Sequence, residues 1–365
     1  MRLAKRFAIL TVLSMLLALL AACGDNTATT APAATTAAAT TAAAATTAAA
    51  TTAAATTAAA TTAAATTAAG ATTAAATTAA SATAAADVVI PAGAGTEAEK
   101  KDLVMGLVPS RQSDVIQTQA DNIAAFLSKE TGYNIKAVVV KSYAAVGEGM
   151  SAKNIDIGWV GPLDYVISNK KFGTYPITAS VRKNTLGYKA FIVARADSGI
   201  SSLADLKGKT VCLGDDISAS SNLYPSAALI AAGIKPGTDV QVRKITNQSA
   251  IAIAVEEKAC DAGAFYDDAR TNKEVTDKYP NILKDTKIVY TTELIPADPQ
   301  IVRKDLNAAE VKKIYAAMLK LSNDPNGKKY INDLFTIDGL APISDSAYDG
   351  LRKVIQSAKP DLLQS

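Results

Sequence analysis

No histidine occurs anywhere in the 365-residue chain. Histidine is the most frequent general base and a usual metal ligand, so its absence excludes Ser-His-Asp and Cys-His catalytic arrangements. The chain also carries no cofactor-binding motif and no clear pair of nucleophile and base. These absences argue against an enzyme, and they predict a binding protein with no cofactor and no metal.

An excess of charge of either sign is missing as well. Of 37 basic and 34 acidic residues, three and one respectively lie before residue 87, which leaves 34 and 33 in the rest of the chain. A surface with so balanced a charge gives no reason to expect a nucleic-acid partner or a polybasic patch that binds membranes.

The chain begins with three basic residues and an apolar run from Phe7 to Leu20, which is typical of a secretory signal and short for a membrane span. The run ends in Leu20-Ala21-Ala22-Cys23-Gly24, which closely resembles the bacterial lipobox. The resemblance implies a signal peptide over residues 1–22, lipidation of Cys23 and a lipid anchor on the extracytoplasmic face of the cell membrane. An ordinary signal peptide with a chance cysteine is the alternative.

Residues 23–97 lack what a folded core needs. Between residues 27 and 86 the sequence is almost wholly Ala and Thr, with neither a charge nor a large apolar side chain. Such a stretch cannot bury a core, so we interpret residues 23–97 as a low-complexity linker that separates the next domain from the membrane. Repeat expansion with no role beyond length is the alternative.

Residues 98–365 are globular in composition, and strand-like stretches alternate with helix-like ones. The elements predicted in the first half are strands at 103–108, 135–140 and 155–159 and helices at 113–128 and 143–150. The alternation restarts near residue 206, and a helical stretch from 308 to 357 follows. This pattern predicts an α/β fold with a parallel sheet, built as two units with a cleft for a small ligand between them.

A serine-rich turn stands between a predicted strand, 210–214, and a helical stretch, 226–232. The first N–H groups of a helix have no intrahelical partner and lie at the positive end of its dipole, so such a turn suits an oxyanion. The hydroxyls of Ser218, Ser220 and Ser221 can add donors beside those amides. The alternative is that these serines only cap the helix, which serine does well.

Six segments of this part of the chain follow one another in a characteristic order: Lys141 to Ala144, Asn154 to Pro162, Leu186 to Tyr188, the Ser218 turn, Ala254 to Gly263 and Leu294 to Pro299. In this order and spacing they resemble the substrate-binding proteins of phosphonate, phosphite and phosphate ABC importers. The resemblance implies a two-lobed, type II periplasmic-binding fold that closes on its ligand by hinge motion. It places lobe 1 at about 98–190 plus a C-terminal return, and lobe 2 at about 191–295.

The resemblance also implies ligand contacts. Tyr143 and Tyr188 match two tyrosines that border the ligand and donate hydroxyl hydrogen bonds to the oxyanion. Ser218 and Ser220 match the two serines of an anion-binding turn. The alternative for the tyrosines is that they are ordinary half-buried aromatic residues.

Carboxylates complete the expected site. Asp298 matches an acid that faces the ligand, although it could instead only fix a hinge turn between two prolines. Asp268 falls near the place where aminophosphonate-binding relatives carry an amine-binding carboxylate, and Asp267 is an equal candidate.

Three positions depart from the family pattern. Ala219 replaces a threonine and Gln248 replaces a histidine, so one hydroxyl donor and one ionisable group are missing. Each loss removes about 1–2 kcal/mol of binding free energy for a tetrahedral oxyanion. Ser221, which replaces a glycine, can compensate, and another anion such as a sulfonate or a carboxylate stays open.

Once Cys23 is lipidated, Cys212 and Cys260 remain. Both lie early in predicted strands of lobe 2, and those strands are neighbours in the fold that the resemblance implies. In an exported protein an even pair of cysteines favours a disulfide. Two buried thiols are the alternative.

These observations predict a monomeric, membrane-tethered solute-binding lipoprotein. It would capture a phosphonate, phosphite or phosphate-like oxyanion and deliver it to the transmembrane subunits of an ABC permease. Four alternatives remain: a protein for another small anion, a ferric-ion binder that uses two tyrosines and a carboxylate, an enzyme on the same scaffold, and a ligand sensor for a signalling receptor.

Overall fold

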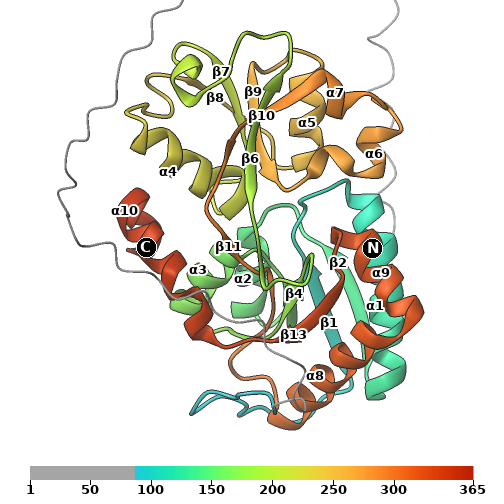
Figure 1. Ribbon diagram of the computed structural model, residues 1–365. Coiled ribbons are helices and arrows are strands. Elements are labelled where there is room, and N and C mark those ends of the chain that lie inside the picture. The colour runs from blue at the N-terminus through green and yellow to red at the C-terminus, as the bar shows by residue number, and fades with distance from the viewer. Residues whose placement is uncertain (1–86, 365) are drawn as a thin grey trace, which may run out of the picture. The chain divides into compact units, whose positions relative to one another are not determined.

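The computed structural model describes residues 87–364 (Figure 1). The expected signal peptide over residues 1–22, the lipidation site at Cys23 and the repeat as far as residue 86 lie outside the described residues. The described residues form two lobes, each with its own sheet. Apolar cores lie within each lobe, and one further core includes residues of both.

Residues 87–97, which the sequence places in the linker, lie against lobe 1. Val88 and Ile90 pack on its core, and the Glu97 carboxylate lies 2.6 Å from the Lys153 ammonium. The packed part of the chain therefore includes this segment.

Lobe 1 is built on a six-stranded sheet in the order β13-β4-β12-β3-β1-β2. Its strands are β1 (Asp102–Leu107), β2 (Asn134–Val139), β3 (Ile157–Trp159), β4 (Tyr175–Val181), β12 (Pro299–Val302) and β13 (Gly339–Pro342). Side chains alternate across β1: Leu103, Met105 and Leu107 enter one core, whereas Val104 packs against the other. This period of two is why the strand separates two helical layers.

Helices cover both faces of this sheet (Figure 1). On the face of Leu103 lie α1 (Ser113–Thr131), α8 (Ala308–Asn323) and α9 (Pro325–Phe335), and on the other α2 (Ala144–Ser151) and α3 (Pro162–Phe172). The ends of α1 and α3 are set by Gly132 and Gly173, which adopt the left-handed conformation that stops a helix.

Lobe 2 is built on a five-stranded sheet in the order β10-β6-β9-β7-β8. Its strands are β6 (Ala190–Arg195), β7 (Thr210–Leu213), β8 (Gln241–Lys244), β9 (Ala262–Tyr266) and β10 (Thr286–Thr291). Its helices are α4 (Tyr224–Ala231), α5 (Gln248–Glu256), α6 (Lys273–Thr276) and α7 (Ile282–Asp285). Residues of α4 and α5 belong to different apolar cores, one on each face of the sheet.

Both sheets are mixed, whereas the alternation of strands and helices predicts parallel ones. The strands β12 and β6 run antiparallel to their neighbours. Each of them follows directly on a passage of the chain from one lobe to the other. The chain then enters the sheet from the edge that faces the other lobe, without the helical crossover that a parallel strand needs. The two-lobed α/β architecture itself is confirmed.

The chain passes between the lobes twice, at residues 182–189 and 292–298. The two passages pair through β5 (Gly187–Tyr188) and β11 (Ile295–Pro296), which are antiparallel. After α9 and β13, the helix α10 (Asp349–Ala358) packs against α3 of lobe 1 and α4 of lobe 2. The C-terminal region thus returns across both lobes.

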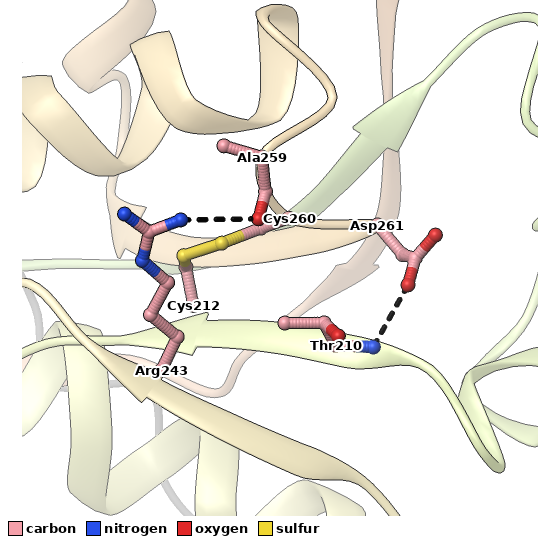
Figure 2. The surroundings of a disulfide bond; sticks show 6 residues. All are labelled: Thr210, Cys212, Arg243, Ala259, Cys260 and Asp261. Atoms are coloured by element: carbon pink, nitrogen blue, oxygen red, sulfur yellow. Dashed lines mark hydrogen bonds between the residues drawn. A yellow bond between two sulfur atoms is a disulfide. The ribbon is translucent and has the colours of Figure 1, made fainter.

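A disulfide joins Cys212 of β7 to Cys260, just before β9, with their Cα atoms 5.9 Å apart (Figure 2). The two strands are parallel neighbours, which brings the cysteines together. Beside it, the Thr210 N–H donates to the Asp261 carboxylate at 2.8 Å. The pairing favoured by the sequence is the one found.

Candidate functional site

A cavity of about 50 Å³ lies between the lobes, lined by residues of both lobes and of both passages. Seven of the nine candidate ligand residues line it: Tyr143, Tyr188, Ser218, Ala219, Ser220, Gln248 and Asp298. Ser221 and Asp268 are not among the lining residues. Segments more than a hundred residues apart therefore meet at one place.

The serine turn is a short π-helical segment, Ala219–Leu223, that runs directly into α4. Ser218 caps it: its hydroxyl accepts from the Ser221 N–H at 3.3 Å and from the Ser221 hydroxyl at 2.7 Å. A serine hydroxyl has two acceptor sites and one proton. With both acceptor sites used by Ser221, the Ser218 hydroxyl acts as a donor at the cavity wall, where the Tyr143 hydroxyl is its neighbour. Ser218 therefore caps the helical segment and also lines the cavity.

A glycine makes the turn possible. A Cβ atom on Gly214, at the end of β7, would lie 1.8 Å from the Ser221 hydroxyl. The close approach is held by the Gly214 N–H, which donates to the Ser221 carbonyl at 2.8 Å. Ser221 therefore supports the turn from behind and does not line the cavity.

Two tyrosines border the cavity from lobe 1 and the first passage. Tyr143 precedes α2, and Tyr188 lies in β5. Burial raises the pKa of both hydroxyls far above the usual value, and the nearby Asp298 carboxylate adds to the effect. Both hydroxyls consequently keep their protons at neutral pH. The Tyr143 hydroxyl is hydrogen-bonded to Gln248 and Ser218, and the Tyr188 hydroxyl to Ser220 and Asp298.

Gln248 occupies the first position of α5 and is buried. Its side-chain oxygen accepts from the Tyr266 N–H at 2.9 Å and from the Ser220 hydroxyl at 3.3 Å. This fixes which end of the amide is the oxygen, so the NH₂ group lies toward the Tyr143 hydroxyl, 3.4 Å away. Gln248 is a neutral donor in the cavity wall.

Asp298 lies on the second passage, immediately before β12, and its carbonyl accepts from the Ser180 N–H at 2.9 Å. Its carboxylate forms an ion pair with Arg182, at 2.8 Å between Oδ2 and Nη1. The Arg182 guanidinium also lies 5.2 Å from the centre of the Tyr188 ring. The cavity wall thus carries one carboxylate and one guanidinium in contact.

The two other acidic candidates are engaged elsewhere. The Asp268 carboxylate binds the Arg270 guanidinium at 2.6 Å and accepts from the Arg270 N–H at 3.1 Å. Asp267 lies 3.0 Å from the exposed Lys183 ammonium and does not line the cavity. Asp268 is therefore a cap for a short helical turn, and the structure does not bring it to the site.

Several lining residues were not among the candidates: Trp159, Ser180, Arg182, Tyr266 and Gln300. The most informative are Arg182 and Trp159, the latter because its indole N–H is buried and has no partner among the described residues. The only signal in the sequence is position: Arg182 directly follows β4 and begins the first passage, and Trp159 ends β3. Strand ends that face a cleft are where such side chains are to be sought.

No helix within residues 87–364 has both the length and the apolar character needed to cross a bilayer. In the same part of the chain, no group of three or more Cys, Asp or Glu side chains is placed to hold a metal ion.

Two α/β lobes joined by two passages, with a small cavity between them, define a solute-binding protein. The family model for the periplasmic substrate-binding protein of phosphonate ABC transporters matches residues 105–348, about two thirds of the chain. This chain belongs to that family.

Two named relatives are consistent with this family. The phosphate-import protein PhnD of Mycolicibacterium smegmatis is 28% identical over 286 residues, which cover 72% of this chain and 88% of that protein. The phosphonates-binding periplasmic protein of Escherichia coli is 26% identical over 263 residues, which cover 70% and 75% respectively. The first is named for the import of phosphate and the second for the binding of phosphonates.

Solved structures show the same fold. A binding protein of a phosphonate ABC transporter from Pseudomonas aeruginosa superposes with a TM-score of 0.65 at 22% identity, covering 72% of this chain and 87% of that one. PhnD1 of Prochlorococcus marinus, in complex with methylphosphonate, gives a TM-score of 0.63 at 21% identity, covering 70% and 98%. The type II periplasmic-binding fold implied by the resemblance is confirmed.

Proposed function

We propose that this chain is the extracytoplasmic solute-binding component of an ABC importer and that its cavity holds phosphate, phosphite or a short phosphonate. The observation that carries the proposal is the convergence of donors on one small cavity: the hydroxyls of Tyr143, Tyr188 and Ser218, and the amide of Gln248. An oxyanion with three or four oxygens satisfies such a set of donors. The named ligands of the relatives support the same class.

The size of the cavity narrows the class. A volume of about 50 Å³ corresponds to roughly four water-sized groups. This fits phosphate, phosphite or methylphosphonate better than a phosphonate with a long substituent. Because Asp268 is bound to Arg270, it is also not placed to receive the amine of an aminophosphonate.

Asp298 favours phosphorus over sulfur. A phosphorus oxyanion that keeps one P–OH group can donate that proton to the Asp298 carboxylate. A sulfonate has no such proton, so its oxygens would face the carboxylate as like charges, which costs several kcal/mol. A sulfonate is therefore the weaker candidate ligand.

A ferric site and a catalytic site fit less well. Iron binds the ionised tyrosine, but burial raises the pKa of both tyrosines and keeps them protonated. Catalysis needs a base beside a serine, but in the described residues Ser218 contacts Ser221 and Tyr143, and Ser220 contacts Gln248 and Tyr188. None of these groups takes up a proton at neutral pH. The proposal is binding without chemistry.

The proposed protein is a monomer that is tethered through lipidated Cys23, with residues 1–22 removed, and it passes its ligand to permease subunits. The apolar run and lipobox-like sequence support the anchor. Mass spectrometry of the N-terminal peptide of the chain purified from membranes tests this directly. An unmodified Cys23 thiol would contradict it.

The ligand is tested by thermal-shift screening of the full chain in detergent against phosphate, phosphite, methylphosphonate, 2-aminoethylphosphonate, sulfate and methanesulfonate. A ligand at 100 times its Kd adds about 2.7 kcal/mol to the free energy of unfolding. We expect the small phosphorus oxyanions to raise the melting temperature of the wild type, and this rise to be lost in Ser218→Ala. In Asp298→Asn, we expect methanesulfonate to bind and to raise the melting temperature as well. Protein free of bound ligand that responds to none of them would overturn the proposal.

A further inference from the structure

Among the residues that line the cavity in the described part of the chain, Arg182 is the one cation. The other donors in the wall are neutral hydroxyls and amides, and Gln248 cannot become charged. An anion that leaves water for this cavity therefore has a single positive group available to it.

Arg182 is held in place before any ligand arrives. Its Nη2 donates to the carbonyl of Phe335, at the end of α9, at 3.2 Å. Its guanidinium lies over the ring of Tyr188 at 5.2 Å, and only 13% of its side chain is exposed. A guanidinium fixed in this way loses little conformational freedom when it binds an oxyanion.

One nitrogen of Arg182 has unused donor capacity. Nη1 is buried and lies 2.8 Å from Asp298 Oδ2, yet it makes no hydrogen bond of acceptable angle to any described residue. A buried donor without a hydrogen-bond partner destabilises the folded state, unless a bound group accepts its hydrogen bond. The cavity is the place where such a partner can sit, because Arg182 and Asp298 both line it.

We propose that Arg182 binds the ligand directly and supplies the positive charge that Gln248 cannot. This inference rests on the proposed function. In the complex, Arg182 donates hydrogen bonds to the oxygens of the anion. Asp298 accepts a hydrogen bond from the P–OH group of the anion, so the two residues act on different sides of the same ligand. A phosphorus oxyanion that carries one proton matches both.

A simpler role for Arg182 would be to neutralise Asp298 without contacting the ligand. A double-mutant cycle separates the two roles. Isothermal titration with phosphate and with methylphosphonate gives Kd for the full chain and for Arg182→Met, Asp298→Asn and the double variant. Arg243→Met is the matched control, because Arg243 is exposed and contacts the Ala259 carbonyl, away from the cavity.

If Arg182 contacts the ligand, Arg182→Met weakens binding by about 10- to 100-fold, the range of a hydrogen bond to a charged group, and the double variant stays weak. Arg182→Lys, which keeps the charge but loses the fork, gives an intermediate Kd. Arg243→Met binds like the wild type. Circular dichroism of each variant checks its fold, and Arg182→Lys serves as the reference if Arg182→Met does not fold.

Two results overturn the assignment alone: a wild-type Kd for Arg182→Met, or recovery of the wild-type Kd in the double variant, which would show that Arg182 only neutralises Asp298. Failure of the proposed function gives a different result. In that case the wild-type chain itself binds neither phosphate nor methylphosphonate, and the role proposed for Arg182 is then wrong as well.

Discussion

Arg111 and Glu274 belong to different lobes and form a buried, two-pronged ion pair. The Arg111 Nε and Nη2 groups donate to the two carboxylate oxygens of Glu274 at 2.9 and 2.6 Å, and both side chains are less than a tenth exposed. Arg111 lies between β1 and α1, whereas Glu274 lies in α6. The Ser249 hydroxyl also donates to Glu274 at 2.8 Å. The pair therefore fastens the lobes beside the cavity.

We expect Glu274→Ala to favour an arrangement in which the two lobes lie further apart than in this structure. Removing one partner of a buried ion pair leaves the other uncompensated, which costs about 3–5 kcal/mol. Because the pair spans the cleft, part of this cost appears as weaker ligand binding, with an expected rise in Kd of about 10-fold or more. Small-angle scattering and titration with phosphate measure the two effects. Asp267→Asn, which removes the pair between Asp267 of lobe 2 and the exposed Lys183 of the first passage, is the control and should change little.

The same pair predicts a pH dependence. Burial alone would raise the pKa of the Glu274 carboxyl, but hydrogen bonds and charge from Arg111 outweigh it and hold the pKa below the usual value of 4.5. A folded-state pKa below the unfolded value gives stabilisation that is present above about pH 4.5 and lost as pH falls through the folded-state pKa. The difference in melting temperature between wild type and Glu274→Gln should therefore shrink on acidification. A constant difference from neutral pH to about pH 3 would contradict this.

Loss of the disulfide should lower stability and leave binding intact. Cys212 and Cys260 are 48 residues apart, and the chain-entropy model assigns a loop of this length about 4 kcal/mol. Neither cysteine lines the cavity. The variant Cys212→Ser with Cys260→Ser should melt at a lower temperature with an unchanged Kd for phosphate. Dithiothreitol should lower the melting temperature of the wild type and not that of the variant.

Gly214→Ala should damage the site through the serine turn. Its Cβ would lie 1.8 Å from the Ser221 hydroxyl, so the turn must move, at a cost of about 1–3 kcal/mol. Since Ser221 holds the Ser218 hydroxyl, we expect binding of phosphate to weaken as well. Gly350→Ala is the control, because no atom lies within 4 Å of its added Cβ and it sits in α10. Equal Kd values for the two variants would disprove the dependence.

Features that depend on local pattern could be read from the sequence. The strand–turn–helix of the serine turn follows from an apolar run, small polar residues and a helical stretch close together in the chain. The disulfide could be expected because two parallel neighbours each carry one cysteine. Tyr143, Tyr188 and Asp298 lie in segments that are far apart in the chain. The resemblance to the family predicted them at one site, and all three line the cavity.

Other features depend on contacts that no local pattern specifies. Arg182 reaches the site because the end of β4 meets the second passage, where Asp298 lies. Asp268 was expected near the ligand, but Arg270, only two residues away, takes up its carboxylate. The antiparallel course of β6 and β12 depends on how the passages enter the sheets. In each case, the outcome depends on contacts in the folded chain that the local sequence does not specify.

The packing of residues 87–97 on lobe 1 has a mechanical consequence. Because Val88 and Ile90 lie on the core of lobe 1 and Glu97 is fastened to Lys153, a pull on the chain upstream of residue 87 is borne by lobe 1. In the proposed tethered protein, movement of lobe 2 about the two passages would then carry no load from that side. Tension on the N-terminal end would therefore leave the contacts between the lobes, and with them the affinity for the ligand, unchanged.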